Sequence, residues 1–154
     1  MPSRRGLIAL TEDEQEKLLQ QGWTLQVASM GHKGFPHLVA MWYVMDRGEI
    51  CFTTFRKSQK ILNLQRDSKM TVMLEGGRKY TELHGLVIEG NATLEDDPQN
   101  TARIMAKVGE KYNGIPAPIE TPEAVLKVAS KRVVVRLKPV NIFSWDHKKL
   151  GGVY

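Results

Sequence analysis

Cysteine is nearly missing from this chain of 154 residues, in which Cys51 is the only one. An intramolecular disulfide is therefore excluded. Cys51 lies in an apolar stretch with strand character, so we expect a buried, unreactive thiol and not a nucleophile. The four histidines share no metal-ligand spacing, and the HExxH motif is absent. We therefore expect no metal site.

Long apolar runs and catalytic motifs are also missing. No apolar run is long enough for a membrane span, and the N-terminal region has no sustained apolar segment, so we expect a cytoplasmic protein with no membrane partner. GxSxG, GxxxxGK[ST] and a GxGxxG that opens a helix after a strand do not occur. We therefore expect no catalytic side chains. If the chain is an enzyme, a bound cofactor supplies the chemistry.

The charge balance favours anionic small molecules. Lysine and arginine number 22 against 17 acidic residues, for a net charge of +5. Phosphorylated cofactors and carboxylated substrates suit such a balance. The basic residues are scattered and no familiar nucleic-acid motif occurs, so nucleic acid is not an expected partner. Apolar and charged fractions of 42% and 25% are ordinary for a folded protein, and the length predicts one domain over residues 1–154.

The spacing of apolar and turn residues predicts about six strands and three or four helices. Residues 37–45 are almost continuously apolar, as in a strand covered on both faces. Hairpin turns link most strands, which favours a mainly β (α+β) fold, a small antiparallel barrel with peripheral helices, over a doubly wound sheet. The expected strands span residues 23–30, 37–45, 49–55, 69–74, 84–94 and 131–137, and the expected helices span 12–20, 58–66, 98–112 and a short segment opened by Thr121-Pro122.

Residues 51–67 contain the first candidate binding region. A strand ends in hydroxyl residues, basic residues follow, and a short amphipathic helix then begins. Free N–H groups of a first helical turn favour an anion, and Ser, Thr and Lys add donors and charge. This pattern indicates a phosphate-binding segment, although a solvated basic turn has the same composition. The candidate residues are Thr53, Thr54, Lys57, Ser58 and Lys60.

Two further regions are candidates. The strand 39–43 is expected beside the Thr53 strand, where it could line a planar ring, although Val39 and Met41 suit simple core packing as well. Residues 144–149 place Trp145 among lysines near a chain end. If ordered, this segment is expected to dock on a ligand or partner. A solvated tail is the alternative.

The order of several short motifs resembles the pyridoxamine-phosphate-oxidase-like, flavin/deazaflavin-dependent split β-barrel proteins. Each motif is loose alone, and the resemblance runs over nearly the whole chain. The motifs are GFPHLV (34–39), MWY (41–43), FTT (52–54), KSQK (57–60), NL (63–64), RD (66–67), VIEGNA (87–92) and SWDHKKL (144–150).

The resemblance implies a six-stranded antiparallel split β-barrel of the FMN-binding type. It also implies a homodimer with two cofactor sites at the subunit interface. The first candidate region would hold the cofactor phosphate and ribityl chain. The residues that would line the ring are Val39, Ala40, Met41 and Trp42, and those that would complete the site, from one subunit or the other, are Tyr80, Trp145 and Lys149.

The C-terminal segment SWDHKKLGG stands where true pyridoxamine-phosphate oxidases have an arginine-rich substrate motif, so a vitamin B6 substrate is not expected. The KSQK and SWDHKKL segments are most similar to the branch that uses coenzyme F420, a deazaflavin with a phosphate and an acidic glutamyl tail. A groove with Lys57, Lys60 and either Arg56 or Arg78 would suit that tail.

The resemblance therefore implies an oxidoreductase that uses bound coenzyme F420 for hydride transfer to or from a small planar unsaturated substrate. FMN is the alternative cofactor. A non-catalytic module that binds a flavin or haem is the alternative function. A third alternative, binding to anionic surfaces, is supported by the net charge alone.

Overall fold

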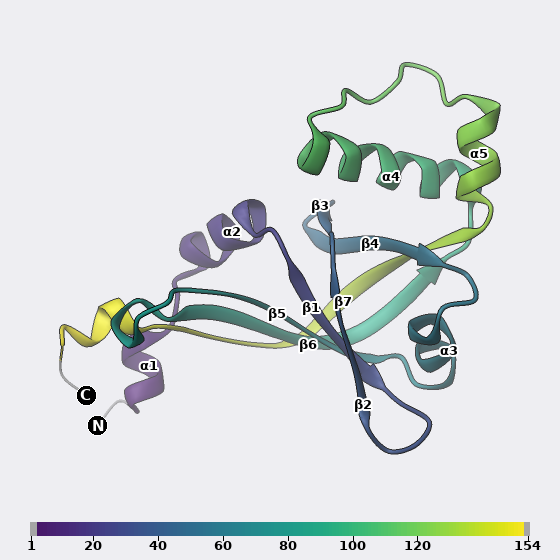
Figure 1. Cartoon of the computed structure of the whole chain (residues 1–154). Coiled ribbons are helices and arrows are strands. Elements are labelled where there is room, and N and C mark those ends of the chain that lie inside the picture. The colour runs from purple at the N-terminus through teal and green to yellow at the C-terminus, as the bar shows by residue number, and fades with distance from the viewer. Residues whose placement is uncertain (1–2, 153–154) are drawn as a thin grey trace.

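The computed structural model describes residues 3–152 as one curled antiparallel sheet with helices packed at its two ends (Figure 1). The order in the sheet is β2-β1-β5-β6-β7-β4-β3. Its strands are β1 (Leu25–Met30), β2 (Pro36–Met41), β3 (Val44–Asp46), β4 (Glu49–Phe55), β5 (Lys69–Gly76), β6 (His84–Glu95) and β7 (Arg132–Asp146). The helices are α1 (Arg4–Ile8), α2 (Glu12–Gln21), α3 (Gln59–Arg66), α4 (Pro98–Asn113) and α5 (Glu123–Ala129), with 3-10 turns η1 (Tyr80–Glu82) and η2 (His147–Leu150).

Local signals fixed most helix boundaries. The Thr11 hydroxyl and the Glu14 carboxylate form a capping box at the start of α2, and Gly22 ends that helix. Asp97 caps α4, which begins at Pro98 and ends at Gly114 in the left-handed conformation. Helix α1 was not expected from the sequence. Within residues 3–152, no helix is long and apolar enough to cross a membrane.

The expectation of one strand over residues 37–45, covered on both faces, is wrong. The chain leaves the sheet at Trp42 and Tyr43, so β2 and β3 are separate and the sheet has seven strands, not six. Strand β2 also alternates between exposed and half-buried residues. Because β2 and β3 are the two edges of the sheet and only two residues join them, these edges lie close together. The barrel is therefore split at Trp42-Tyr43.

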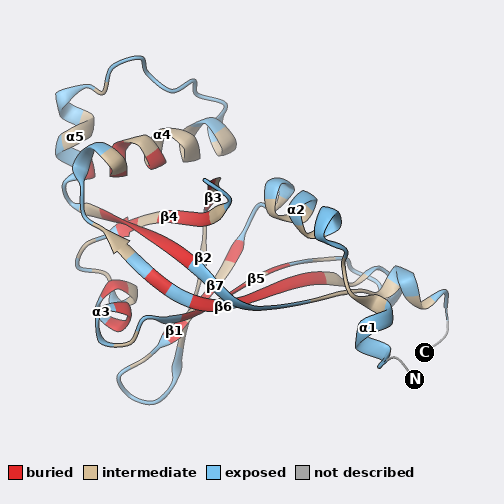
Figure 2. Ribbon diagram, turned by 180° about the vertical axis from the view of Figure 1, so that it is seen from behind, coloured by how far each residue is buried: buried red, intermediate tan, exposed pale blue. Residues whose placement is uncertain are grey.

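The main core fills the inside of the curled sheet. Buried residues, red in Figure 2, follow one another along β4, β6 and β7. A second, smaller cluster lies between the sheet and α4 and contains Val44, Cys51, Ile104 and Val134. Cys51 is fully buried, and burial raises the pKa of its thiol to about 11. The expectation that the thiol is buried is confirmed.

An ionic network lies beneath α4. The Arg136 guanidinium and the Asp46 carboxylate are 4% and 3% exposed and are joined by a bond of 2.8 Å. Arg103 and Lys107 of α4 donate to the same carboxylate at 2.7 and 3.0 Å, and Glu95 lies 3.2 Å from Arg136. These donors hold the pKa of the Asp46 carboxyl far below its ordinary value. The network fastens α4 to the β3–β4 hairpin.

The C-terminal segment is ordered, and the solvated tail is excluded. Strand β7 runs to Asp146, well past the expected end at residue 137, and pairs with β6 along its length. Trp145 lies opposite Gly85, where an added Cβ would collide with the indole ring. Helix α1 and η1 both pack against η2 here, so α1 lies beside this C-terminal turn (Figure 1). We call these three elements the terminal lobe.

Candidate functional site

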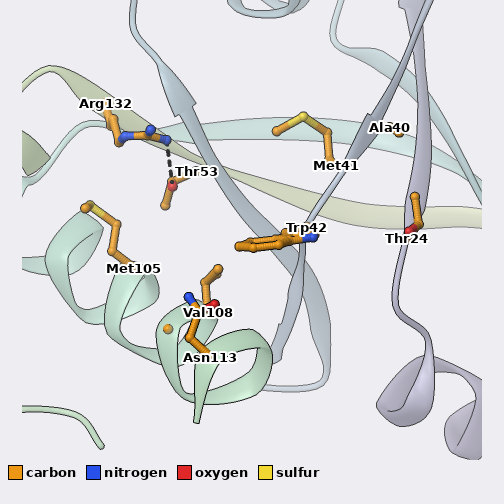
Figure 3. A pocket seen from close by; sticks show the side chains of 10 residues that line it. Thr24, Ala40, Met41, Trp42, Thr53, Met105, Val108, Asn113 and Arg132 are labelled. Atoms are coloured by element: carbon orange, nitrogen blue, oxygen red, sulfur yellow. Dashed lines mark hydrogen bonds between the residues drawn. The ribbon is translucent and has the colours of Figure 1, made fainter. Parts of the chain in front are cut away.

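A cavity of about 620 Å³ lies at the split in the barrel, between the sheet and α4 (Figure 3). The sheet contributes residues from the start of β1 and from β2, β4 and β7, and α4 contributes the opposite wall. None of the described residues that line it is acidic. The lining residues are Thr24, Ala40, Met41, Trp42, Thr53, Met105, Val108, Gly109, Asn113 and Arg132.

One end of the cavity is cationic. Arg132, the first residue of β7, donates from Nη1 to the Thr53 hydroxyl at 3.4 Å and lies 4.2 Å above the Phe55 ring. Its Nε is buried and has no hydrogen-bond partner among the described residues. Burial, together with the neighbouring Arg132 charge, lowers the pKa of Lys60. Two cations close together without a carboxylate make this end suited to a phosphate.

The start of α3 follows β4 after a short turn and brings two more hydroxyl groups together. Ser58 is the N-cap residue, but its side chain makes no capping hydrogen bond. It accepts a bond of 3.3 Å from the Thr54 hydroxyl instead. Lys57 is exposed beside them. Arg56 does not join this group because its guanidinium pairs with Asp96 and donates to the Ser130 carbonyl.

An aromatic stack forms the floor of the cavity. The Trp42 ring projects from the split toward α4 (Figure 3) and stacks on Tyr112, with centroids 4.4 Å apart and 11° between the planes. Trp42 is still 49% exposed. One face of the indole is covered by Tyr112, so the exposed area is on its other face and edges. This leaves a flat apolar surface on which a planar ring can stack.

Two side chains of α4 form hydrogen bonds with the backbone of Tyr43 at the split. Where the chain leaves the sheet, Tyr43 loses its ladder partners. Its N–H donates to the Tyr112 hydroxyl at 3.1 Å, and its carbonyl accepts from Lys111 Nζ at 3.2 Å. Burial lowers the pKa of Lys111 to about 8. By satisfying these two backbone groups, α4 fixes the position of the neighbouring Trp42.

The structure brings together part of the candidate set. Ala40, Met41, Trp42 and Thr53 line the cavity, and Lys60 lies near its Arg132 end. Thr54, Ser58 and Lys57 lie at the neighbouring start of α3. Val39 packs against the main core, which is the alternative that its apolar character left open.

The remaining candidates lie in the terminal lobe of the same chain or, for Trp145, at the end of β7 beside it, at the other end of the sheet (Figure 1). The Tyr80 and His147 rings are 4.6 Å apart. Lys149 donates to the Ala9 carbonyl at 2.8 Å and to the Glu14 carboxylate at 2.6 Å. Trp145 packs on Gly85. Within one chain, these side chains do not reach the cavity at the split.

Sequence reasoning missed Arg132 and the whole α4 wall. Arg132 begins an apolar strand, and a basic residue there carries no distinctive pattern. Met105, Gly109 and Asn113 are four residues apart, so they share one face of α4. That periodicity is visible in the sequence, but it does not reveal which face meets the cavity. Among the described residues, no group of three or more His, Cys, Asp or Glu side chains is placed to hold a metal ion.

The split sheet and its cavity define a protein of the split β-barrel class. The sequence profile of the pyridoxamine 5'-phosphate oxidase family matches residues 11–146, and the chain belongs to this family. The structure of the conserved hypothetical protein Rv2991 from Mycobacterium tuberculosis is 38% identical, with a TM-score of 0.89 over 99% of this chain and 94% of that one. The expected fold is confirmed, except that it has seven strands.

More distant structures share the fold. An F420 reductase is 23% identical, with a TM-score of 0.64 over 82% of this chain and 94% of that one. HutZ, a haem storage protein from Vibrio cholerae, is 17% identical, with a TM-score of 0.65 over 87% and 94%. A search of curated proteins found no match to this chain. Proteins of one fold thus include a named reductase and a named storage protein, so function must be argued from the site.

Proposed function

We propose that this protein is an oxidoreductase that binds coenzyme F420, or alternatively FMN, in the cavity at the split. One observation carries the proposal: a single cavity joins a cationic end without any carboxylate to a flat apolar floor. A phosphorylated ring cofactor has these two parts in one molecule. The residues present therefore fit the group that this family implies.

In this proposal, one group of side chains binds the phosphate and another contacts the ring. Arg132, Lys60 and Thr53 would hold the phosphate, with the hydroxyls at the start of α3 beside them. Ala40, Met41 and Trp42 would lie along the ring. Met105 and Val108 of α4 line the cavity from the other side with apolar surface. Holding two rings in contact is itself a large part of catalysis.

Once bound, the cofactor would supply hydride chemistry with a small planar unsaturated substrate. Among the described residues that line the cavity there is no carboxylate, histidine or cysteine. We therefore propose that the chain contributes orientation and not an acid, base or nucleophile. The choice of F420 over FMN is supported by the exposed Lys57 next to the phosphate end, which could meet an acidic tail that FMN lacks.

The direct test is a titration of the purified protein with F420, FMN and riboflavin, followed by fluorescence. We expect saturable binding of F420 or FMN in the micromolar range or tighter, and weaker binding of riboflavin because it has no phosphate. Saturation by none of the three would exclude the proposed function. A reduced bound cofactor that persists with a broad panel of acceptors would favour the non-catalytic module.

We also propose that two chains associate through the outer face of the sheet, as the family resemblance implies. Cross-strand pairing places Leu38, Ala28, Val87 and Phe143 on this face, and Leu38 and Phe143 are 67% and 50% exposed. A mostly apolar groove of about 610 Å³ lies on this face and is lined by Leu38, Ala28 and Val87 among others. A patch of this kind favours association. The partner's terminal lobe would then be free to approach the cavity.

Light scattering tests the dimer. We expect twice the chain mass of 17.4 kDa for the wild-type protein. Leu38→Asp should yield the single-chain mass, because an aspartate in a buried apolar interface loses its hydration without a partner. Ile119→Asp is the matched control, since Ile119 is fully exposed on the loop before α5. A monomeric wild type, or a Leu38→Asp dimer as tight as the wild type, would contradict the proposal.

A further inference from the structure

A gap interrupts the α4 wall of the cavity. Met105, Gly109 and Asn113 follow one another at intervals of four residues, and all three line the cavity. Residues at this spacing are neighbours on one helix face. Gly109 has no side chain, so a notch opens between those of Met105 and Asn113. We call it the Gly109 notch.

Nothing in the chain itself requires glycine at this position. Gly109 lies inside α4, and its φ angle is not positive. An added Cβ would meet no atom within 4 Å. At Gly90 the opposite holds, because a Cβ there would collide with the Lys138 carbonyl. Glycine is unfavourable inside a helix, so a glycine that packing does not demand needs another reason.

The surroundings of the notch indicate what could occupy it. Met105 and Val108 are apolar, and the exposed surface of Trp42 lines the same cavity. The charged end, with Arg132 and Thr53, is formed by the strands and not by this helix face. Asn113 borders the notch with an amide that both donates and accepts hydrogen bonds. A flat, uncharged ring edge that carries polar atoms fits these walls.

We propose that the Gly109 notch receives the edge of the cofactor ring system, and that Gly109 determines which ring can enter. The inference rests on the proposed function, because it concerns the same cavity. It adds that α4, which the sequence did not connect with binding, contributes a specificity-determining residue. A methyl group placed in the notch would occupy the volume that the ring needs.

The test compares Gly109→Ala and Gly109→Val with the wild-type protein, titrated with FMN, F420 and riboflavin. We expect the dissociation constants to rise roughly 10-fold or more, as for one extra carbon in a tight pocket, and more for valine than for alanine. The factor should be similar for FMN and riboflavin, because the ring is common to both. The melting temperature of Gly109→Ala should instead rise by roughly 2–4 °C, since alanine favours the helix.

Ala106→Gly is the matched control. It lies on α4 one turn earlier and does not line the cavity. It should lower the melting temperature and leave the dissociation constants unchanged. Folded Gly109→Ala and Gly109→Val proteins that bind all three compounds as tightly as the wild type would overturn the inference. Wild-type protein that binds none of them would instead overturn the proposed function.

Discussion

Asp46→Asn is expected to lower the free energy of unfolding by about 3 kcal/mol, which corresponds to a fall of roughly 10 °C in melting temperature. The variant keeps the shape of the side chain and removes its charge. Arg136, only 4% exposed, then loses its shortest ion-pair partner and keeps Glu95 at 3.2 Å. Arg103 and Lys107 lose the same partner. Urea unfolding at neutral pH measures the change.

The pH dependence gives a second measurement of the same network. Because the native pKa of Asp46 is held far below its ordinary value, the charged form contributes stability that is fully present above that value. This contribution is lost as the pH falls through the acid range. The stability difference between the wild type and Asp46→Asn should therefore be largest at neutral pH and shrink below about pH 4.

Asp96→Asn is the control for the loss of one carboxylate. Asp96 pairs with Arg56, but both side chains are largely exposed, at 55% and 41%. Exposed pairs contribute little, so the urea midpoint should not move measurably. An Asp46→Asn protein as stable as the wild type would show that the buried network contributes no net stability.

Arg132→Ala is expected to weaken binding of the phosphorylated cofactor about 10- to 100-fold, the effect of losing a hydrogen bond between charged groups. Arg132 lies beside the Thr53 hydroxyl, and its Nε has no hydrogen-bond partner within residues 3–152. Fluorescence titration with FMN measures the dissociation constant of the variant and of the wild type. Riboflavin affinity should hardly change, because riboflavin offers no phosphate to this end of the cavity.

Matched variants separate a specific contact from general charge. Arg132→Lys keeps the charge but not the planar fork, so its affinity for FMN should be intermediate. Lys60→Ala should weaken FMN binding in the same direction as Arg132→Ala. Lys127→Ala removes one positive charge from the exposed surface of α5 and should leave the dissociation constant unchanged. If Arg132→Ala bound FMN as tightly as the wild type, the proposal that the phosphate binds at this end of the cavity would be wrong.

Local patterns predicted the elements whose cause is local. The capping box at Thr11 and Glu14, the Asp97-Pro98 helix start and the turn at Arg47-Gly48 each form where the sequence indicates. At that turn, both central residues have positive φ, as a two-residue hairpin requires. The expectation that residues 39–43 form a strand beside the Thr53 strand is wrong, because β2 pairs with β1, whereas β4 pairs with β3 and β7. Thr53 and the end of β2 share only the cavity at the split.

The features that the sequence did not reveal depend on contacts between distant segments. The break at Trp42-Tyr43 occurs in an unbroken apolar run, because the hydrogen bonds that stabilise it come from Lys111 and Tyr112, about seventy residues later. The extension of β7 past Leu137 depends on pairing with β6 and not on its own polar sequence. Arg132 enters the site through pairing between β4 and β7.

That pairing has a consequence for how the molecule folds. Strand pairs β1–β2, β3–β4 and β5–β6 join neighbours in the chain, whereas Arg132 and Thr53 are 79 residues apart. Closing a long loop carries a larger entropic penalty, so the β4–β7 seam is expected among the last contacts to form. The phosphate end is built across this seam. A bound cofactor therefore recognises only chains that have completed folding, and by mass action it draws the population toward them.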